Sequence, residues 1–317
     1  TFVPGLPLTF LDYNLVTGDS LAGIGTLDEV TDILDVEQSS LGMFTGGQSV
    51  MKEIREDIDQ LGSFADASAE QVQEARKTRT EIEAKLEQVR ARFDILAASR
   101  IDDDVETDPA SDMSIDVTNH ESYEKAQSIL SSTSPLHFPA AFPEVFDDDN
   151  SGFDVIVGNP PWEEATLEED EFWTRYEPGL RREESHGGNK EEIIDRLRTQ
   201  RPELKRKYEA EKEEQENRRR ILREGPYPGM GEGDPDTYKA FYWRFWSLTD
   251  DSGGVGVILP RGAFLASGSE NFRRKILSES VIEDLTFLKN NGQWAFSGVG
   301  NRMTIGLLSF IKGEEGD

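Results

Sequence analysis

The chain has 317 residues, which is enough for two average domains or for one core with large insertions. It contains no cysteine, which excludes disulfides and cysteine-ligated zinc, and its three histidines (120, 137 and 186) are too scattered to predict a metal site. It has no signal-peptide pattern and no apolar run long enough to span a bilayer, so we expect a cytoplasmic protein without membrane contact. Because it begins with Thr1 and ends on Glu-Glu-Gly-Asp, we expect it to be a piece of a longer protein.

The formal net charge of −29 argues, at face value, against a nucleic-acid-binding protein. However, the 63 acidic residues are spread along the whole chain, and 12 lysines stand beside 22 arginines. This pattern resembles proteins from salt-loving cytoplasms, where the Debye length is roughly 3 Å and an acidic surface repels DNA only weakly. The alternative, an acidic protein that avoids nucleic acid, stays open.

The basic residues are concentrated in one segment. Residues 175–223 hold 15 basic against 12 acidic side chains, a net charge of +3. Such a strip is a candidate phosphate-facing surface, but a solvated helix with paired charges has the same composition. The candidate DNA-binding residues are Arg181, Arg182, Lys205, Arg206, Lys207, Arg218, Arg219 and Arg220.

The N-terminal quarter begins with a short β pattern and continues as helix. Residues 10–21 predict a strand and a turn, with Asp19 just past the strand, and residues 26–46 predict a linker with a short helix. Residues 47–100 predict a helical hairpin broken at Gly62-Ser63, with a capping box at 68–71. The seam positions alternate spacings of three and four within each predicted helix, which is a heptad pattern: Met51, Ile54, Ile58 and Leu61 in the first, and Val72, Ala75, Arg79, Ile82, Leu86, Val89, Phe93 and Leu96 in the second.

The middle of the chain contains one short strand between helical and loop segments. Residues 101–118 are Asp-rich and loop-like, and 119–131 predict a short helix. The run Phe153-Asp-Val-Ile-Val-Gly158 predicts a strand that is buried on both faces and ended by Gly158, where the backbone can bend. Residues 163–233 predict a second, charged and largely helical segment.

The C-terminal part alternates helices and strands. Asp234 and Pro235 predict the start of a helix whose aromatic stripe (Tyr238, Phe241, Tyr242 and Phe245) packs against a sheet. The predicted strands are 253–260, 281–288 and 303–311, with a helix over 267–277. The alternation predicts an α/β fold with a mostly parallel sheet and crossover helices, closing on an edge strand.

The tetrapeptide after the strand at 153–158 carries the chemistry. Two prolines remove backbone donors, so the Asn159 amide and the Pro160 carbonyl can face outward as acceptors beside the Trp162 indole. Two acceptors and an aromatic plate suit a planar group that bears an NH2. The alternative is a plain strand-to-loop turn.

Asn159-Pro160-Pro161-Trp162 resembles the catalytic motif of amino-methyltransferases, and the chain around it resembles gamma-class adenine-specific DNA methyltransferases of the type IIG restriction–modification and phage-defence (BREX-like) kind. The resemblance implies S-adenosyl-L-methionine as cofactor, double-stranded DNA as partner, restriction or defence subunits as further partners, and a target base flipped out of the duplex. It also implies that these four residues are catalytic and that Trp162 stacks the base.

Two further site assignments rest on the same resemblance. A loop before the last strand supplies a second stacking aromatic, for which Phe296 is the choice and Trp294 the substitute. The turn at Asp19 and Ser20 binds the adenine of the cofactor. An Asp in an ordinary turn, or an aromatic side chain in an ordinary loop, remains the alternative for each.

The resemblance covers three parts of the chain and defines the expected domains. Residues 1–25 end the cofactor-binding half, 136–162 hold the catalytic strand and motif, and 234–317 complete the core, while 26–135 and 163–233 are insertions. The fold expected is a Rossmann-like methyltransferase core, incomplete at the N-terminal side, with two large helical insertions.

The family's Gly-rich cofactor motif is not found, because Gly23-Ile-Gly25 and Gly298-Val-Gly300 lack the strand context. We therefore expect the chain alone to bind cofactor weakly and to be inactive. Three alternative functions stay open: an RNA or protein methyltransferase, a non-catalytic DNA-binding subunit, and a structural helical scaffold.

Overall fold

The structure is a computed structural model, and it describes residues 15–34, 53–54, 56, 69–146, 152–162, 167, 169–177, 179–180, 189–230, 235–294, 296 and 304–313. The α-helices in this part are α2 (Leu27–Leu34), α4 (Ala69–Ser99), α5 (Asp108–Ser111), α6 (Glu121–Ile129), α7 (Phe138–Ala141), α8 (Glu169–Tyr176), α10 (Lys190–Gln200), α11 (Pro202–Glu224), α12 (Thr237–Leu248), α13 (Gly262–Leu265) and α14 (Glu270–Glu279). Short 3-10 turns lie at Val117–Asn119, Ser267–Ser269 and Asn291–Gln293. The strands are β1 (Phe153–Gly158), β2 (Thr249–Pro260), β3 (Ser280–Lys289) and β4 (Thr304–Lys312).

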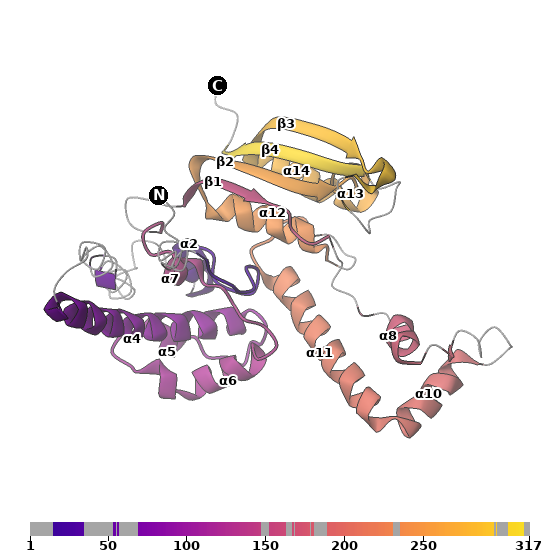
Figure 1. Ribbon diagram of the computed structural model, residues 1–317, viewed down its shortest axis with the longest axis horizontal. Helices are drawn as coiled ribbons and strands as arrows, with labels where there is room; N and C mark the ends of the chain where they lie inside the picture. The colour runs from indigo at the N-terminus through magenta and orange to yellow at the C-terminus, as the bar shows by residue number, and fades with distance from the viewer. Residues whose placement is uncertain are drawn as a thin grey trace.

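The four strands form one sheet in the order β1-β2-β4-β3 (Figure 1). β1 pairs with β2 in parallel, but β4 is antiparallel to both of its neighbours. The predicted closing edge strand was therefore wrong, because β4 lies between β2 and β3. A mostly parallel arrangement was also not found among these strands, since only the β1–β2 pair is parallel.

The two faces of the sheet differ in what covers them. Helices α12, α13 and α14 lie on one side (Figure 1), where Tyr242 packs on Phe310 with ring centroids 4.7 Å apart. On the other side Val155 is 66% and Val157 is 81% exposed. The prediction that the strand 153–158 is buried on both faces was therefore wrong: within the described residues it is an edge strand with one face open.

The start of α12 also differs from the prediction. Its N-cap is Asp236 rather than Asp234, and the Asp236 carboxylate binds the buried ammonium of Lys239 at 2.7 Å instead of capping the backbone. The aromatic stripe does pack on the sheet side as predicted, with Tyr238 and Tyr242 in the core and Phe245 partly buried.

The helical segment before the sheet is built on α4. Its seam is confirmed where side chains are described, since the following are buried: Ile82, Leu86, Val89, Phe93 and Leu96. Most of the first predicted helix of the hairpin, and Ser68 of the capping box, fall outside the described residues. Ile54 is buried, and Glu53 binds Lys85 of α4 at 3.2 Å, so this part of the first helix lies against the second.

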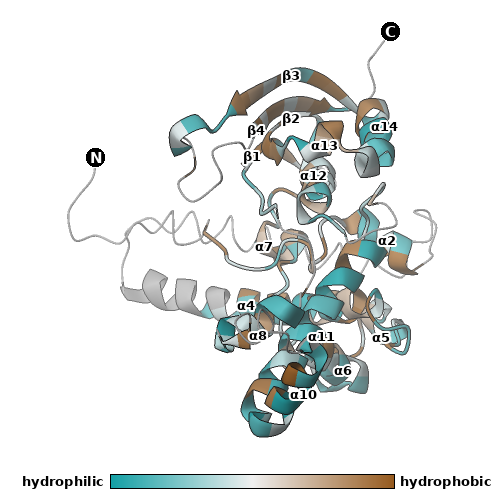
Figure 2. Cartoon of the chain, turned by 90° about the vertical axis from the view of Figure 1, so that its right-hand side faces the viewer, coloured by the Kyte–Doolittle hydropathy of each residue, from teal (hydrophilic) through white to brown (hydrophobic). Residues whose placement is uncertain are grey.

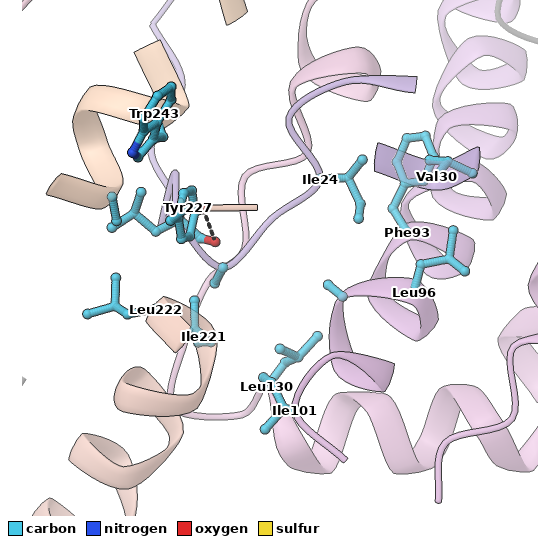
Figure 3. Close-up of a cluster of buried hydrophobic side chains, with 14 of the residues drawn as sticks. Ile24, Val30, Phe93, Leu96, Ile101, Leu130, Ile221, Leu222, Tyr227 and Trp243 are labelled. Carbon is cyan, nitrogen blue, oxygen red and sulfur yellow. Dashed lines mark hydrogen bonds between the residues drawn. The ribbon is translucent and has the colours of Figure 1, made fainter. Parts of the chain in front are cut away.

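One hydrophobic cluster joins this helical segment to the sheet. Figure 3 shows side chains from α4 (Phe93, Leu96), from the segment before α2 (Ile24), from the end of α11 (Ile221) and from α12 (Trp243), all of which belong to that cluster. Segments far apart in sequence thus share one core.

Helices α8, α10 and α11 form an arm with a second, smaller core. Phe172, Trp173 and Ile194 are buried there against Leu204 and Tyr208 of α11. In Figure 2 most of the ribbon of α10 and α11 has the hydrophilic colour. The helical character predicted for 163–233 is confirmed, and none of the described helices is long and apolar enough to cross a membrane.

Candidate active site

The motif follows directly on the carboxyl end of β1, next to the parallel strand β2, as expected. Asn159 and Pro161 are exposed, Pro160 is buried and Trp162 is half-buried. Within the described residues no group hydrogen-bonds the Asn159 side chain. Its amide is thus available to a bound group, which is what the predicted role requires.

Gly158 has a packing role rather than the backbone role that we predicted. Its φ is not in the left-handed region, and a Cβ there would lie 2.5 Å from the ring of Phe245. The glycine lets α12 approach the end of β1 closely, and this approach fixes the strand from which Asn159 projects.

Trp162 is anchored and has an aromatic neighbour. Its indole Nε1–H donates to the carbonyl of Ile258 in β2 at 3.2 Å. The ring of Phe296, 134 residues further along the chain, lies with its centroid 6.1 Å from that of Trp162 and is tilted by 57°. The structure thus brings together the two residues predicted to stack the base. Trp294, the substitute, is 64% exposed, and its Nε1–H donates to the carbonyl of Lys289.

A shallow groove of about 440 Å³ runs from the motif across the open face of the sheet. Its floor is flat because Gly256 and Ser309 face each other on β2 and β4. Its polar side chains are those of Asn159, Ser309 and Asp284 of β3. The groove gives a planar ligand access to Asn159 from this side.

The turn predicted to bind the cofactor forms, and most of the strand predicted before it lies outside the described residues. Residues 15–18 are not in a strand, and 10–14 lie outside the described part. Asp19 Oδ1 accepts from the amides of Leu21 and Ala22 at 2.9 and 3.1 Å, so this oxygen is used by the turn. Oδ2 lies 3.9 Å from Arg218. Ser20 is half-buried in the same turn. Asp19 therefore uses one oxygen in the turn, and a ligand at the other oxygen would have to displace Arg218.

The turn at Asp19 is joined to the catalytic strand by the predicted lead-in. Asp19 pairs with the backbone at Pro135, and the chain then enters a cluster in which Phe142 and Phe146 place their rings edge-on against Phe153 of β1. The lead-in at 136–146 thus packs on the strand that carries the motif.

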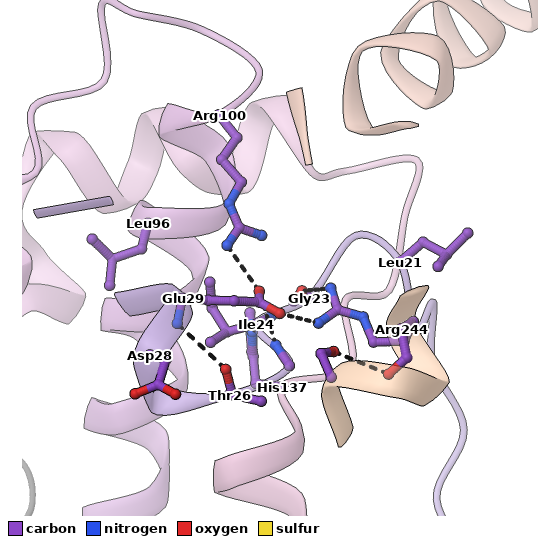
Figure 4. Close-up of polar contacts among 12 residues, drawn as sticks. Leu21, Gly23, Ile24, Thr26, Asp28, Glu29, Leu96, Arg100, His137 and Arg244 are labelled. Carbon is purple, nitrogen blue, oxygen red and sulfur yellow. Dashed lines mark hydrogen bonds and ion pairs between the residues drawn. The ribbon is translucent and has the colours of Figure 1, made fainter. Parts of the chain in front are cut away.

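Sequence analysis missed a buried ionic network beside this turn (Figure 4). Arg244 of α12 is fully buried, pairs with the carboxylate of Glu29, and donates to the Gly23 carbonyl at 2.9 Å and to Tyr227 Oη at 2.8 Å. Arg100, in the turn directly after α4, binds the other oxygen of Glu29 at 2.8 Å. The network ties the turn region to α4 and α12.

The charges in this network set its protonation. Burial alone would raise the pKa of Glu29, but Arg244 and Arg100 outweigh it and hold that pKa below its ordinary value. Burial raises the pKa of Tyr227 to about 12. Glu29 is therefore ionised at neutral pH, and Tyr227 is a neutral phenol that donates to the Leu21 carbonyl at 2.9 Å.

The same network explains Gly23-Ile24-Gly25. A Cβ at Gly23 would lie 2.0 Å from the Leu136 carbonyl oxygen, and one at Gly25 would lie 1.7 Å from Arg244 Nη1. These glycines are required by packing, in agreement with their exclusion as a cofactor motif. An arginine inside an otherwise aromatic helix was the sequence signal that could have revealed the network.

The predicted DNA-binding residues are largely paired. Lys205 binds Glu209 at 3.7 Å, Lys207 lies 4.8 Å above the ring of Tyr176, and Arg218 faces Asp19. Arg206 donates to the Pro202 carbonyl at 3.5 Å, Arg219 is half-buried and Arg220 is exposed. Arg181 and Arg182 lie outside the described residues. The contacts favour the interpretation as a solvated helix with paired charges, and a role in DNA binding stays a prediction.

Comparison with known proteins supports the methylase assignment. Residues 55–193 match the family described as the Eco57I restriction-modification methylase. This range includes Asn159–Trp162 and all of α4. The similarity supports a DNA methyltransferase of the restriction–modification type, a class that generally uses S-adenosylmethionine. No curated protein matches the chain. No cluster of three or more metal-ligating side chains occurs in the described part of the chain.

Proposed function

We propose that this chain is part of a restriction–modification or phage-defence enzyme that methylates the exocyclic amino group of adenine in double-stranded DNA, with S-adenosyl-L-methionine as cofactor and a base flipped out of the duplex. The observation that carries the proposal is the presence of two features at the end of β1. The Asn159 amide accepts or donates no hydrogen bond within the described residues, and the rings of Trp162 and Phe296 lie next to each other. The methylase similarity over 55–193 supports the reaction class.

The chemistry required of the chain is electrostatic. The amino nitrogen of adenine is a poor nucleophile because its lone pair is delocalised into the ring. Asn159 Oδ1 and the Pro160 carbonyl each accept one N–H, which favours a tetrahedral nitrogen and stabilises the positive charge that develops on it. S-adenosylmethionine, when bound, supplies a methyl carbon on a sulfonium sulfur that leaves as a neutral thioether. One proton then leaves the methylated nitrogen and restores its neutral form.

The described residues fit this cofactor in part. Asp19 Oδ2 would accept from the amino group of the cofactor's adenine in place of its 3.9 Å contact with Arg218, and Ser20 offers a hydroxyl in the same turn. The glycines at 23 and 25 are occupied by packing, so they are not assigned to the methionine end.

The proposal is tested by expressing the full reading frame that encodes this chain in a host without adenine methylation. Single-molecule sequencing of the host DNA should then show N6-methyladenine within one sequence motif, and Asn159→Ala should abolish it. Asn291→Ala, at an exposed asparagine, is the matched control. N4-methylcytosine instead would assign the other amino base, and unmodified DNA with retained DNA binding would assign a non-catalytic subunit.

A further inference from the structure

The turn after β3 is organised around one buried side chain. Asn290 is fully buried, and its amide makes two bonds to the backbone of the same residue, Phe296. Nδ2 donates to the Phe296 carbonyl at 3.0 Å, and Oδ1 accepts the Phe296 N–H at 3.2 Å. This side chain reproduces the donor–acceptor pair that a neighbouring strand would offer, and so it fixes the backbone of Phe296.

The turn between them is strained. Gly292 has φ of 72° and Gln293 has φ of 57°, which is uncommon for a residue with a side chain. The Gln293 N–H bonds the Asn290 carbonyl at 3.0 Å. Such a conformation persists only where the surrounding structure enforces it. Here the two hydrogen bonds from the Asn290 side chain to the Phe296 backbone enforce it.

Both residues of the aromatic pair are thus held in place by hydrogen bonds to residues that are not part of the pair. Trp162 is tied through Nε1 to Ile258 of β2, and Phe296 is tied through its backbone to Asn290 at the end of β3. Ring centroids 6.1 Å apart are in direct contact, so no base fits between them in this arrangement. A base can enter when the Phe296 ring rotates, since its side chain is not bonded while the Trp162 indole is.

We propose that Asn290 is the positioning residue of the target-base site. It holds the Phe296 backbone while the ring fills the base position in the free protein, and the ring then rotates to stack on the flipped base. This inference rests on the proposed function, and it adds a residue that touches neither base nor cofactor.

The test compares Asn290→Ala with Phe296→Ala, with the double variant, and with Asn291→Ala as the exposed control, in the full-length enzyme. Single-turnover methylation is measured on duplexes in which the target adenine is paired normally or lies opposite an abasic site. Asn290→Ala should lower the rate on the paired duplex by roughly tenfold, since it removes the stacking support. The defect should shrink opposite the abasic site, where the base is already unpaired.

If Asn290 acts through Phe296, the double variant is no slower than Phe296→Ala alone. Asn290→Asp keeps the acceptor for the Phe296 N–H, so its methylation rate should fall between those of wild type and Asn290→Ala. It replaces Asn290→Ala in the test if Asn290→Ala fails to unfold cooperatively. The inference is overturned if Asn290→Ala methylates like Asn291→Ala, or if its effect adds fully to that of Phe296→Ala. Failure of the proposed function is distinguishable, because then wild type itself does not methylate or Asn159→Ala methylates like wild type.

Discussion

Asn159 and Trp162 are three residues apart, but the fold holds their side chains differently. The amide of Asn159 has no hydrogen-bond partner in the described part of the chain, whereas the indole of Trp162 is anchored to β2. A group that must respond to charge in a transition state is left free, and a group that must present a flat face is held. Removing each should therefore affect a different step.

Trp162→Ala should weaken capture of the flipped base by about 1–3 kcal/mol, by analogy with base stacking on aromatic side chains. The measurement is the fluorescence of 2-aminopurine placed at the target position, titrated with enzyme. Leu277→Ala is the control, because Leu277 is an exposed apolar side chain on α14 to which no role at the base site is assigned. Equal 2-aminopurine fluorescence for the two variants would show that Trp162 does not contact the target base.

Glu29 gives a pH-dependent prediction at the same scale. Its folded pKa lies below its unfolded value, so its contribution to stability is present above the ordinary carboxylate pKa and is lost as pH falls through the folded value. Glu29→Gln leaves Arg244 buried without its counter-charge, which should cost about 3–5 kcal/mol at neutral pH, with the difference from wild type shrinking in acid.

Chemical denaturation at several pH values measures this difference. The control is Glu270→Gln, whose ion pair with Arg274 on α14 is exposed and should contribute about 0–1 kcal/mol. A Glu29→Gln effect as small as that of the control would contradict the structural role of the network.

Contacts between distant residues were predictable only where the family resemblance indicated them. Phe296 was chosen from that resemblance and from its distance to the next strand, and its ring lies 6.1 Å from that of Trp162, while its stacking role stays a prediction. The Glu29–Arg244 pair spans 215 residues, and no local pattern specifies it. Asp19 was predicted in a turn after a strand: the turn forms, and its backbone pairs with distant Pro135, which no local pattern indicates, while residues 10–14 of the predicted strand lie outside the described part.

At the scale of elements, the end of β1 is set by the approach of α12. Gly158→Ala would place a methyl group 2.5 Å from the Phe245 ring, so helix and strand must separate. We expect a lower melting temperature and a loss of methylation that exceeds the loss of DNA binding, because the motif moves with the strand. Gly254→Ala is the control, since nothing lies within 4 Å of a Cβ there. Equal melting temperatures for the two variants would contradict this account.

The elements themselves were largely predictable, but their order in the sheet was not. Helix α4 and the strands at 153–158, 253–260 and 281–288 follow from periodicity and β-branched runs. The insertion of β4 between β2 and β3 depends on which edge its backbone pairs with, and side-chain patterns do not encode that choice. The exposure of Val155 and Val157 likewise depends on what covers the sheet rather than on their own apolar character.

At the scale of the whole molecule, a single core ties the helical segment to the sheet, while the net charge of −29 opposes compaction. Salt screens this repulsion, because the Debye length falls from about 10 Å at 0.1 M to about 3 Å at 1 M. The unfolding midpoint should therefore rise between about 0.1 and 3 M KCl. A flat or falling midpoint would remove the high-salt explanation and favour a protein that avoids DNA.

The central claim is that Asn159 stabilises charge on the target amino nitrogen. Its most direct test is single-turnover methylation by Asn159→Ala in the full-length enzyme, beside a DNA-binding titration. Loss of one preorganised acceptor should lower the rate by about 10²–10³-fold. DNA affinity should stay nearly unchanged, since phosphate contacts dominate it. A rate within a few-fold of wild type would show that Asn159 is only a turn residue at the end of β1.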